Sequence, residues 1–132
     1  MKTKYLLDTN VIVELLRGAS DALISKLREI GVNSCAIADI TLYELYCGIF
    51  ESKNKNENFI RVNDALSGLE VIPASESYLT AAEQKSKLYS IGKPIEDFDL
   101  LIGCTALHSQ RVLLTGNVKH MSRIEGLKIE SI

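Results

Sequence analysis

Short apolar segments alternate with amphipathic ones along the whole chain, and this alternation constrains the fold more than any other feature. The strand-like segments are residues 4–7, 34–37, 70–72, 112–114 and 127–129. Helical spacing of apolar residues predicts helices over residues 11–17, 21–30, 39–50, 59–67, 75–91 and 97–109, with a short helix after Asn117. Strands separated by helices need crossover connections, which make neighbouring strands parallel. We therefore expect an α/β fold: a three-layer sandwich whose central, mostly parallel sheet of four to five strands carries helices on both faces.

Chain length and hydropathy predict one domain without a membrane segment. A chain of 132 residues can bury one substantial core, so we expect a single domain over residues 1–132. No apolar run approaches the roughly 20 residues that cross a bilayer. The basic N-terminus is followed by a stretch that Asp8, Asn10 and Glu14 interrupt, which a signal peptide would not tolerate. We expect a cytoplasmic protein.

Charge and cysteine spacing exclude two kinds of protein. A net charge of −2 argues against nonspecific coating of nucleic acid, although an enzyme can still gather acids in one pocket and recruit cations there. Cys35, Cys47 and Cys104 lack the spacing of zinc ligands and lie in apolar surroundings. They are expected to be buried free thiols.

The first strand ends in Asp8, Thr9 and Asn10. Ligands of open parallel sheets bind just beyond the carboxyl ends of the strands, which makes Asp8 a candidate for chemistry. The alternative is that Asp8 or Asn10 only caps the following helix. Strand 112–114 also ends in small polar residues, including Asn117. If the two strands are parallel, Asp8 and Asn117 emerge at the same edge of the sheet, although Asn117 alone could be a turn residue or a helix cap.

Glu44 lies within a predicted helix, on a face that it shares with apolar residues such as Ile40 and Cys47. A charge on that face needs a reason. Thr41 and Glu44 have capping-box spacing, which offers a purely structural one. Asp39 is an equally good cap two residues earlier, and it would place Glu44 inside the helix, where capping does not explain it.

Asp99 begins a helix that is apolar on almost every side from residue 100 to 107, as expected for a central buried element. Either Asp97 or Asp99 could cap this helix, which leaves one acid free for another role. Glu96 is expected to be solvated. Gly103, one turn after Asp99, would let another backbone or a ligand approach.

The segments around these residues resemble one family. They are residues 7–10 (Leu-Asp-Thr-Asn), Glu44 with its neighbours, Asp99 with residues 100–102, and residues 114–117 (Leu-Thr-Gly-Asn). In this order and spacing they resemble the PIN-domain ribonucleases, and most closely the VapC-type toxins of bacterial and archaeal toxin–antitoxin systems. The resemblance spans essentially the whole chain.

The resemblance implies a PIN-like fold, a Mg²⁺- or Mn²⁺-dependent endoribonuclease that cleaves RNA, a cognate VapB-like antitoxin and a homodimer. By position, Asp8, Glu44 and Asp99 would form its acidic triad. Asn117 stands where relatives have Asp or Asn, so a fourth carboxylate is absent. His120 and Met121 replace an acid followed by Phe in many relatives.

The chemistry of carboxylates supports a metal site independently. Converging carboxylates repel one another, and one takes up a proton unless a cation neutralises them. Oxygen ligands favour Mg²⁺ or Mn²⁺. We assign Asp8 and Asp99 as primary ligands of one ion, Glu44 as a ligand or water-positioning group, and Asn117 as a neutral ligand or hydrogen-bonder. The supporting residues are Thr9 and Thr115, which would orient these groups, and Asn10, which is expected to do the capping instead of Asp8.

Substrate contacts and other functions are less constrained. The cations nearest the site in sequence are Lys93, Lys119, His120 and Arg123. The alternatives are a solitary PIN-type RNA-processing nuclease, a metal-dependent phosphatase or phosphotransferase with Asp8 as nucleophile, and a catalytically weak interaction module. The phosphatase is disfavoured because Asn occupies position 10, where haloacid-dehalogenase-like enzymes have a second Asp.

Overall fold

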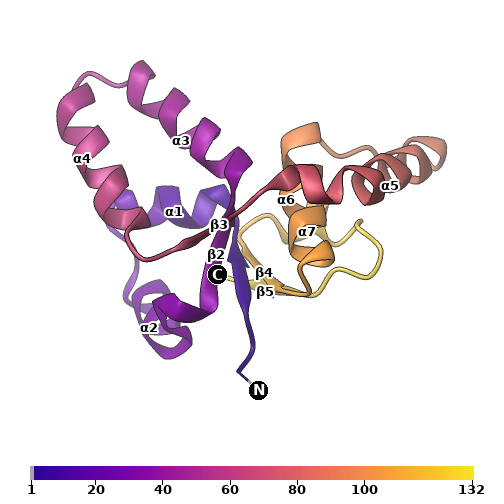
Figure 1. The fold of residues 1–132 in the computed structure, drawn as a ribbon, viewed down its shortest axis with the longest axis horizontal. Coiled ribbons are helices and arrows are strands. Elements are labelled where there is room, and N and C mark those ends of the chain that lie inside the picture. The colour runs from indigo at the N-terminus through magenta and orange to yellow at the C-terminus, as the bar shows by residue number, and fades with distance from the viewer. Residues whose placement is uncertain (1) are drawn as a thin grey trace.

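The computed structural model describes residues 2–132 and contains a five-stranded, fully parallel sheet in the order β3-β2-β1-β4-β5 (Figure 1). The strands are β1 (Tyr5–Leu7), β2 (Cys35–Ala38), β3 (Glu70–Ile72), β4 (Val112–Thr115) and β5 (Ile129–Ser131). The predicted parallel α/β sheet is confirmed. Strand β1 lies at its centre, between β2 and β4.

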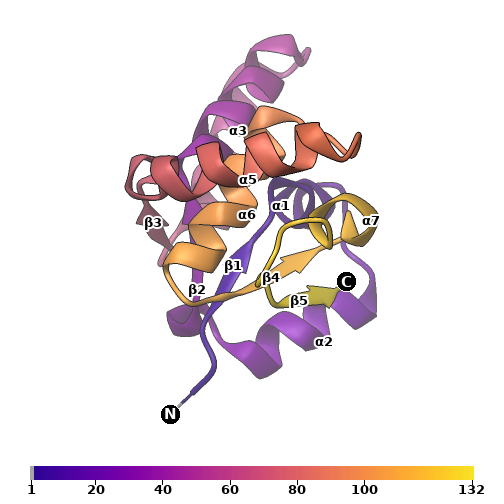
Figure 2. The same cartoon turned by 90° about the vertical axis from the view of Figure 1, so that its right-hand side faces the viewer.

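Helices cover both faces of the sheet, as predicted. On one face lie α1 (Thr9–Leu16), α2 (Asp21–Ile30), α3 (Asp39–Glu51) and α4 (Lys55–Leu66), and on the other lie α5 (Tyr78–Ser90), α6 (Asp97–His108) and α7 (Val118–Met121) (Figures 1 and 2). None of the helices in residues 2–132 combines the length and apolar character that crossing a bilayer requires.

Two apolar clusters hold the layers together because strand side chains alternate between faces. In β1, Leu6 joins the cluster under α5 and α6, whereas Tyr5 and Leu7 join the cluster under α1 to α4. Of the three thiols, Cys35 and Cys104 are buried, as expected, and Cys47 is only half-buried.

Three boundaries differ from the predictions. Helix α4 begins at Lys55, although residues 51–58 were expected to be a loop. The helix predicted over residues 75–91 is divided into a 3₁₀ turn at Ala74–Ser77 and α5. Strand β5 begins two residues later than expected. None of these differences moves a candidate site residue to another element.

Candidate functional site

The predicted site residues come from four elements at the carboxyl edge of the sheet. Asp8 directly follows β1, Asn117 follows β4, Glu44 lies within α3 and Asp99 lies in the first turn of α6. Because β1 and β4 are neighbours, the Asp8 amide donates a 3.0 Å hydrogen bond to the Leu114 carbonyl. The expectation that Asp8 and Asn117 emerge at one edge is therefore confirmed.

Asp8 is only 3% exposed, and its carboxylate is held from three sides. Oδ1 accepts a hydrogen bond from the Thr9 amide at 2.8 Å. Oδ2 accepts one from the Thr115 hydroxyl at 2.7 Å and one from the Asn10 side chain at 3.3 Å. Burial raises the pKa of Asp8 above its usual value, while the bonds from Thr115 and Thr9 oppose the rise.

Asn10 does not cap helix α1, contrary to the prediction. The N-cap residue is Asp8, whose side chain accepts from the first helical amide. Asn10 instead joins the ends of two strands: its amide group donates to Asp8, and its Oδ1 accepts from the Gly116 amide at 3.2 Å. Asp8 therefore caps the helix with one oxygen and presents the other toward Thr115 and the site.

Glu44 is the sixth residue of α3, so a capping box with Thr41 is excluded. Its Oε1 accepts a 2.7 Å hydrogen bond from the Thr9 hydroxyl, whose oxygen also lies 2.9 Å from Oγ1 of Thr41. Thr9 thus contacts the group that it was predicted to orient. The alternative cap, Asp39, is also wrong: its Oδ1 accepts from the Ala74 amide at 3.0 Å, and it makes no cap bond.

Asp99 is half-buried and faces other carboxylates. Burial raises its pKa to about 6, and the negative charges of Asp8, Glu96 and Glu44 add to the rise. In residues 2–132, none of the five ion pairs includes Asp8, Glu44 or Asp99. These acids therefore form a negative centre that no protein cation neutralises.

The acids next to Asp99 differ in their positions. Asp97 forms a 2.8 Å ion pair with Lys85 on the surface, which accounts for its charge. Glu96 is exposed, as expected, yet it lines a cleft of about 510 Å³ together with Asp99, Asn117 and His120. Sequence reasoning missed this role. Its position next to the Asp97–Asp99 pair was the only signal that could have suggested it.

Gly103 serves packing, because no ligand or backbone approaches it. A Cβ at this position would lie 2.3 Å from Cδ1 of Ile124 and 3.4 Å from Sδ of Met121. Both of these side chains are buried. The predicted role of Gly103 in admitting a ligand or a backbone is wrong.

The predicted substrate-contacting cations gather beside the acidic cleft. Lys93, Lys119 and Arg123 line a second pocket of about 400 Å³, next in sequence to residues of the cleft. His120 lines the cleft itself, where its Nδ1 lies 2.8 Å from Oδ1 of Asn117. Phosphate groups would find positive charge at this rim.

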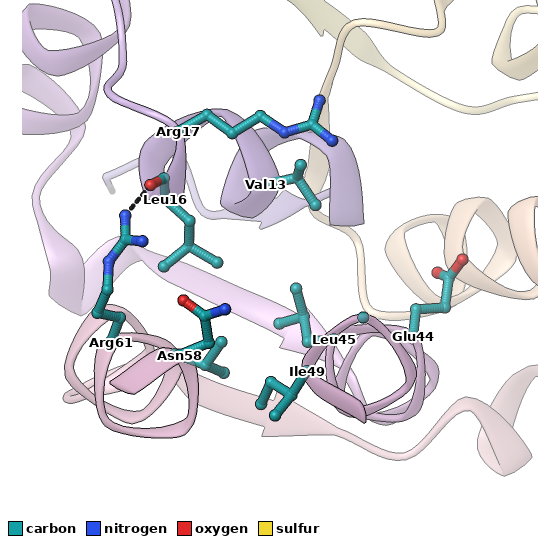
Figure 3. Close-up of a pocket in the computed structure, with 10 residues that line it drawn as sticks. Val13, Leu16, Arg17, Glu44, Leu45, Ile49, Asn58 and Arg61 are labelled. Atoms are coloured by element: carbon teal, nitrogen blue, oxygen red, sulfur yellow. Dashed lines mark hydrogen bonds between the residues drawn. The ribbon is translucent and has the colours of Figure 1, made fainter. Parts of the chain in front are cut away.

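A groove between α1, α3 and α4 reaches the acidic centre from the other face of the sheet (Figure 3). Its volume is about 270 Å³, and its apolar lining includes Val13, Leu16 and Leu45, with Arg17 and Arg61 among its polar residues. Glu44 belongs to both the groove and the acidic centre. A molecule bound in the groove could therefore contact a candidate catalytic residue.

The acidic centre provides donors for a hard divalent cation. Within residues 2–132, no three His, Cys, Asp or Glu side chains are grouped closely enough to hold one metal ion among them. The available set is the carboxylates of Asp8 and Asp99 with the amide oxygen of Asn117. Mg²⁺ is typically held by one or two carboxylates together with water and substrate phosphate, so a sparse set of this kind fits it.

Comparisons with known proteins agree with this geometry. Residues 5–127 match the PIN domain family. The chain is 33% identical over 129 residues to Ribonuclease VapC2 of Rickettsia felis, covering 96% of each protein. A crystal structure of VapBC2 from Rickettsia felis bound to a promoter DNA fragment aligns with a TM-score of 0.92 at 31% identity, covering 98% of this chain and 99% of that one. A toxin–antitoxin complex from Klebsiella pneumoniae aligns with a TM-score of 0.70 at 27% identity over 94% and 95% of the two chains.

Proposed function

The chain belongs to the PIN domain family, and on that premise we propose that it is a metal-dependent endoribonuclease, the toxin of a toxin–antitoxin pair. The observation that carries the proposal is the un-neutralised acidic centre, in which Asp99 has a pKa raised to about 6 beside the buried Asp8. Mg²⁺ or Mn²⁺ would neutralise this centre.

The residues divide the work of phosphodiester hydrolysis among them. Asp8 and Asp99 hold the cation, and the hydrogen bonds from Thr115 and Thr9 fix the direction in which Asp8 presents its carboxylate. Glu44, held by Thr9, positions the attacking water or completes the ligand set. Asn117 contributes a neutral oxygen. When bound, the cation supplies an activated water and stabilises negative charge on the phosphate, each worth several kcal/mol.

The negative centre alone would repel RNA, and its surroundings offset this repulsion. Lys93, Lys119 and Arg123 place positive charge in the neighbouring pocket, where the phosphates that flank the cleaved bond would bind. These residues come from α7 and from the loop before α6, so the RNA would cross that rim of the site.

A VapB-like antitoxin is the proposed partner. The groove between α1, α3 and α4 offers an apolar floor to a segment of that partner, with Glu44 at one end to receive a basic side chain (Figure 3). Such a segment would neutralise a catalytic residue as it binds, which would inhibit cleavage. We also propose a homodimer.

Cleavage of a panel of RNAs tests the function. Wild-type protein with Mg²⁺ or Mn²⁺ should cut RNA internally, and Asp8→Asn and Asp99→Asn should abolish cleavage. Asp97→Asn is the matched control because Asp97 is exposed and paired with Lys85. Equal activity in wild type and in both active-site variants would refute the nuclease assignment. Co-purification with the product of the upstream reading frame tests the antitoxin.

A further inference from the structure

Tyr43 and Phe98 form an exposed aromatic pair at the rim of the acidic centre. Their ring centroids lie 5.6 Å apart at an interplanar angle of 88°, an edge-to-face contact between α3 and α6. They are 56% and 41% exposed. Rings of this size are normally buried when their role is to stabilise a core, so the exposure of both requires another explanation.

The position of the pair connects it to the site. Tyr43 directly precedes Glu44 on α3, and Phe98 directly precedes Asp99 on α6. Consecutive side chains on a helix diverge by about 100°. The same two helices therefore carry two carboxylates into the site and two rings onto its edge.

The surroundings of the pair favour a nucleobase as its ligand. RNA must bring a phosphate to a negative centre, so contacts with its uncharged bases add affinity without adding repulsion. The cleft has a cationic pocket on one neighbouring rim, at Lys93, Lys119 and Arg123, and the aromatic pair on another. Positive charge for the backbone together with aromatic faces for the bases is the combination by which proteins bind single-stranded nucleic acid.

We propose that Tyr43 and Phe98 stack one unpaired base of the RNA next to the cleaved phosphodiester bond. This inference rests on the proposed function and deepens it, because it makes single-stranded RNA the substrate class. Stacking requires a base that is splayed out of a helix, and every base has a face that can stack. The pair therefore selects for unpaired structure at the cleavage position.

Binding measurements test the platform separately from catalysis. In the Asp99→Asn background, fluorescence anisotropy with a short single-stranded oligoribonucleotide should show affinity about 5- to 150-fold weaker for Tyr43→Ala or Phe98→Ala. Tyr43→Phe should retain affinity because it keeps the ring. The matched control is Tyr46→Ala with Phe59→Ala, which removes an exposed stacked pair with centroids 6.2 Å apart that joins α3 to α4. This control should bind as the parent does.

An abasic nucleotide identifies the stacked base. Moved one position at a time along the oligonucleotide, it should weaken binding to the parent protein at one position, by about the factor that Tyr43→Ala causes. Binding to the Tyr43→Ala variant should not depend on that position. The proposal is overturned if no position matters, if the Tyr46 and Phe59 control loses as much affinity, or if light scattering shows that the loss comes from a changed oligomeric state.

The platform and the nuclease can fail independently. If wild-type protein cleaves RNA and Asp99→Asn does not, while Tyr43→Ala and Phe98→Ala bind and cleave normally, only the platform is wrong. If no RNA is cleaved with either metal but binding depends on the aromatic pair and on the base, the nuclease assignment is wrong and the platform stands.

Discussion

The Thr115 hydroxyl donates a 2.7 Å hydrogen bond to Oδ2 of Asp8, linking the ends of two neighbouring strands in the interior of the protein. Thr115 is fully buried and Asp8 nearly so. The bond lowers the pKa of a carboxylate that burial raises. It therefore holds the side chain in place and also favours its ionised form.

Thr115→Val should separate these effects from folding, because it removes the hydroxyl while keeping the shape. The pKa of Asp8 should rise further, which shifts the acid limb of the pH–rate profile to higher pH. We expect cleavage to fall by about 10- to 100-fold near pH 7, as is typical when a hydrogen-bond partner of a metal ligand is lost. Thr115→Ser should restore most of the rate, and an unchanged pH profile in Thr115→Val would contradict the assigned role.

Asp99→Asn should stabilise the metal-free protein at neutral pH while removing its activity. Asp99 has a folded pKa of about 6 against a model value of 3.8, so its ionisation opposes folding. Its contribution to stability is therefore greatest at low pH and declines as pH rises from about 4 through 6. Allowing for solvent screening of a half-buried group, the gain at pH 7.5 should be about 1–2 kcal/mol.

Urea denaturation in EDTA at pH 4 and pH 7.5 measures this gain. The difference between Asp99→Asn and wild type should be present at the higher pH and nearly absent at the lower one. Asp97→Asn serves as the control because it removes an exposed, ion-paired acid of the same helix. A gain of equal size at both pH values would mean that ionisation of Asp99 does not oppose folding.

Metal binding should follow the protonation of the same group. Titration calorimetry with Mn²⁺ should give about one ion per chain at pH 7.5, with affinity that falls below pH 6 as Asp99 takes up its proton. Bound ion should also raise the melting temperature of wild type more than that of Asp8→Asn. Two tight sites without RNA would show that the neutral side chain of Asn117 does not limit occupancy.

Gly103→Ala tests the close packing of α6 against the C-terminal segment. The new Cβ would lie 2.3 Å from Cδ1 of Ile124, which is 2% exposed and has little room to move. Overpacking of this kind costs about 1–3 kcal/mol, partly offset by the roughly 1 kcal/mol that Ala gains over Gly in a helix. The double variant Gly103→Ala with Ile124→Val removes the clashing methyl, and in urea denaturation it should regain the lost stability.

Leu16→Glu should weaken antitoxin binding because it places a charge on the apolar floor of the groove. RNA cleavage by the free protein should stay near the wild-type rate, whereas inhibition by the antitoxin should require a higher concentration. Leu79→Glu is the control: Leu79 is 89% exposed on α5, on the other face of the sheet. Equal inhibition of both variants would place the antitoxin elsewhere.

The sequence predicted the parallel sheet and its two helical layers because strand and helix periods are local patterns. The start of α4 was missed because residues 55–58 are all polar and only Val62 of this helix is buried. Apolar periodicity cannot detect a helical turn that faces solvent on all sides.

The carboxylates of the candidate site were found because each follows an apolar segment or interrupts one. Their hydrogen bonds were harder to foresee. Asn10 was expected to cap a helix, yet it reaches Gly116, which is 106 positions away. Asp39 likewise bonds to Ala74 instead of to its own helix. Local propensity ranks capping residues, but it contains no information about partners that only the completed fold brings near.

The adjacency of β1 and β4 has a consequence for the protein during its synthesis. Asp8 is made early, but the hydroxyl of Thr115 that orients it belongs to the last strand but one. A ribosome-bound chain lacking β4 would carry three acids without the strand that aligns the first of them. A potentially lethal nuclease would thus stay harmless until it is nearly complete, which gives a partner time to arrive before the first cut.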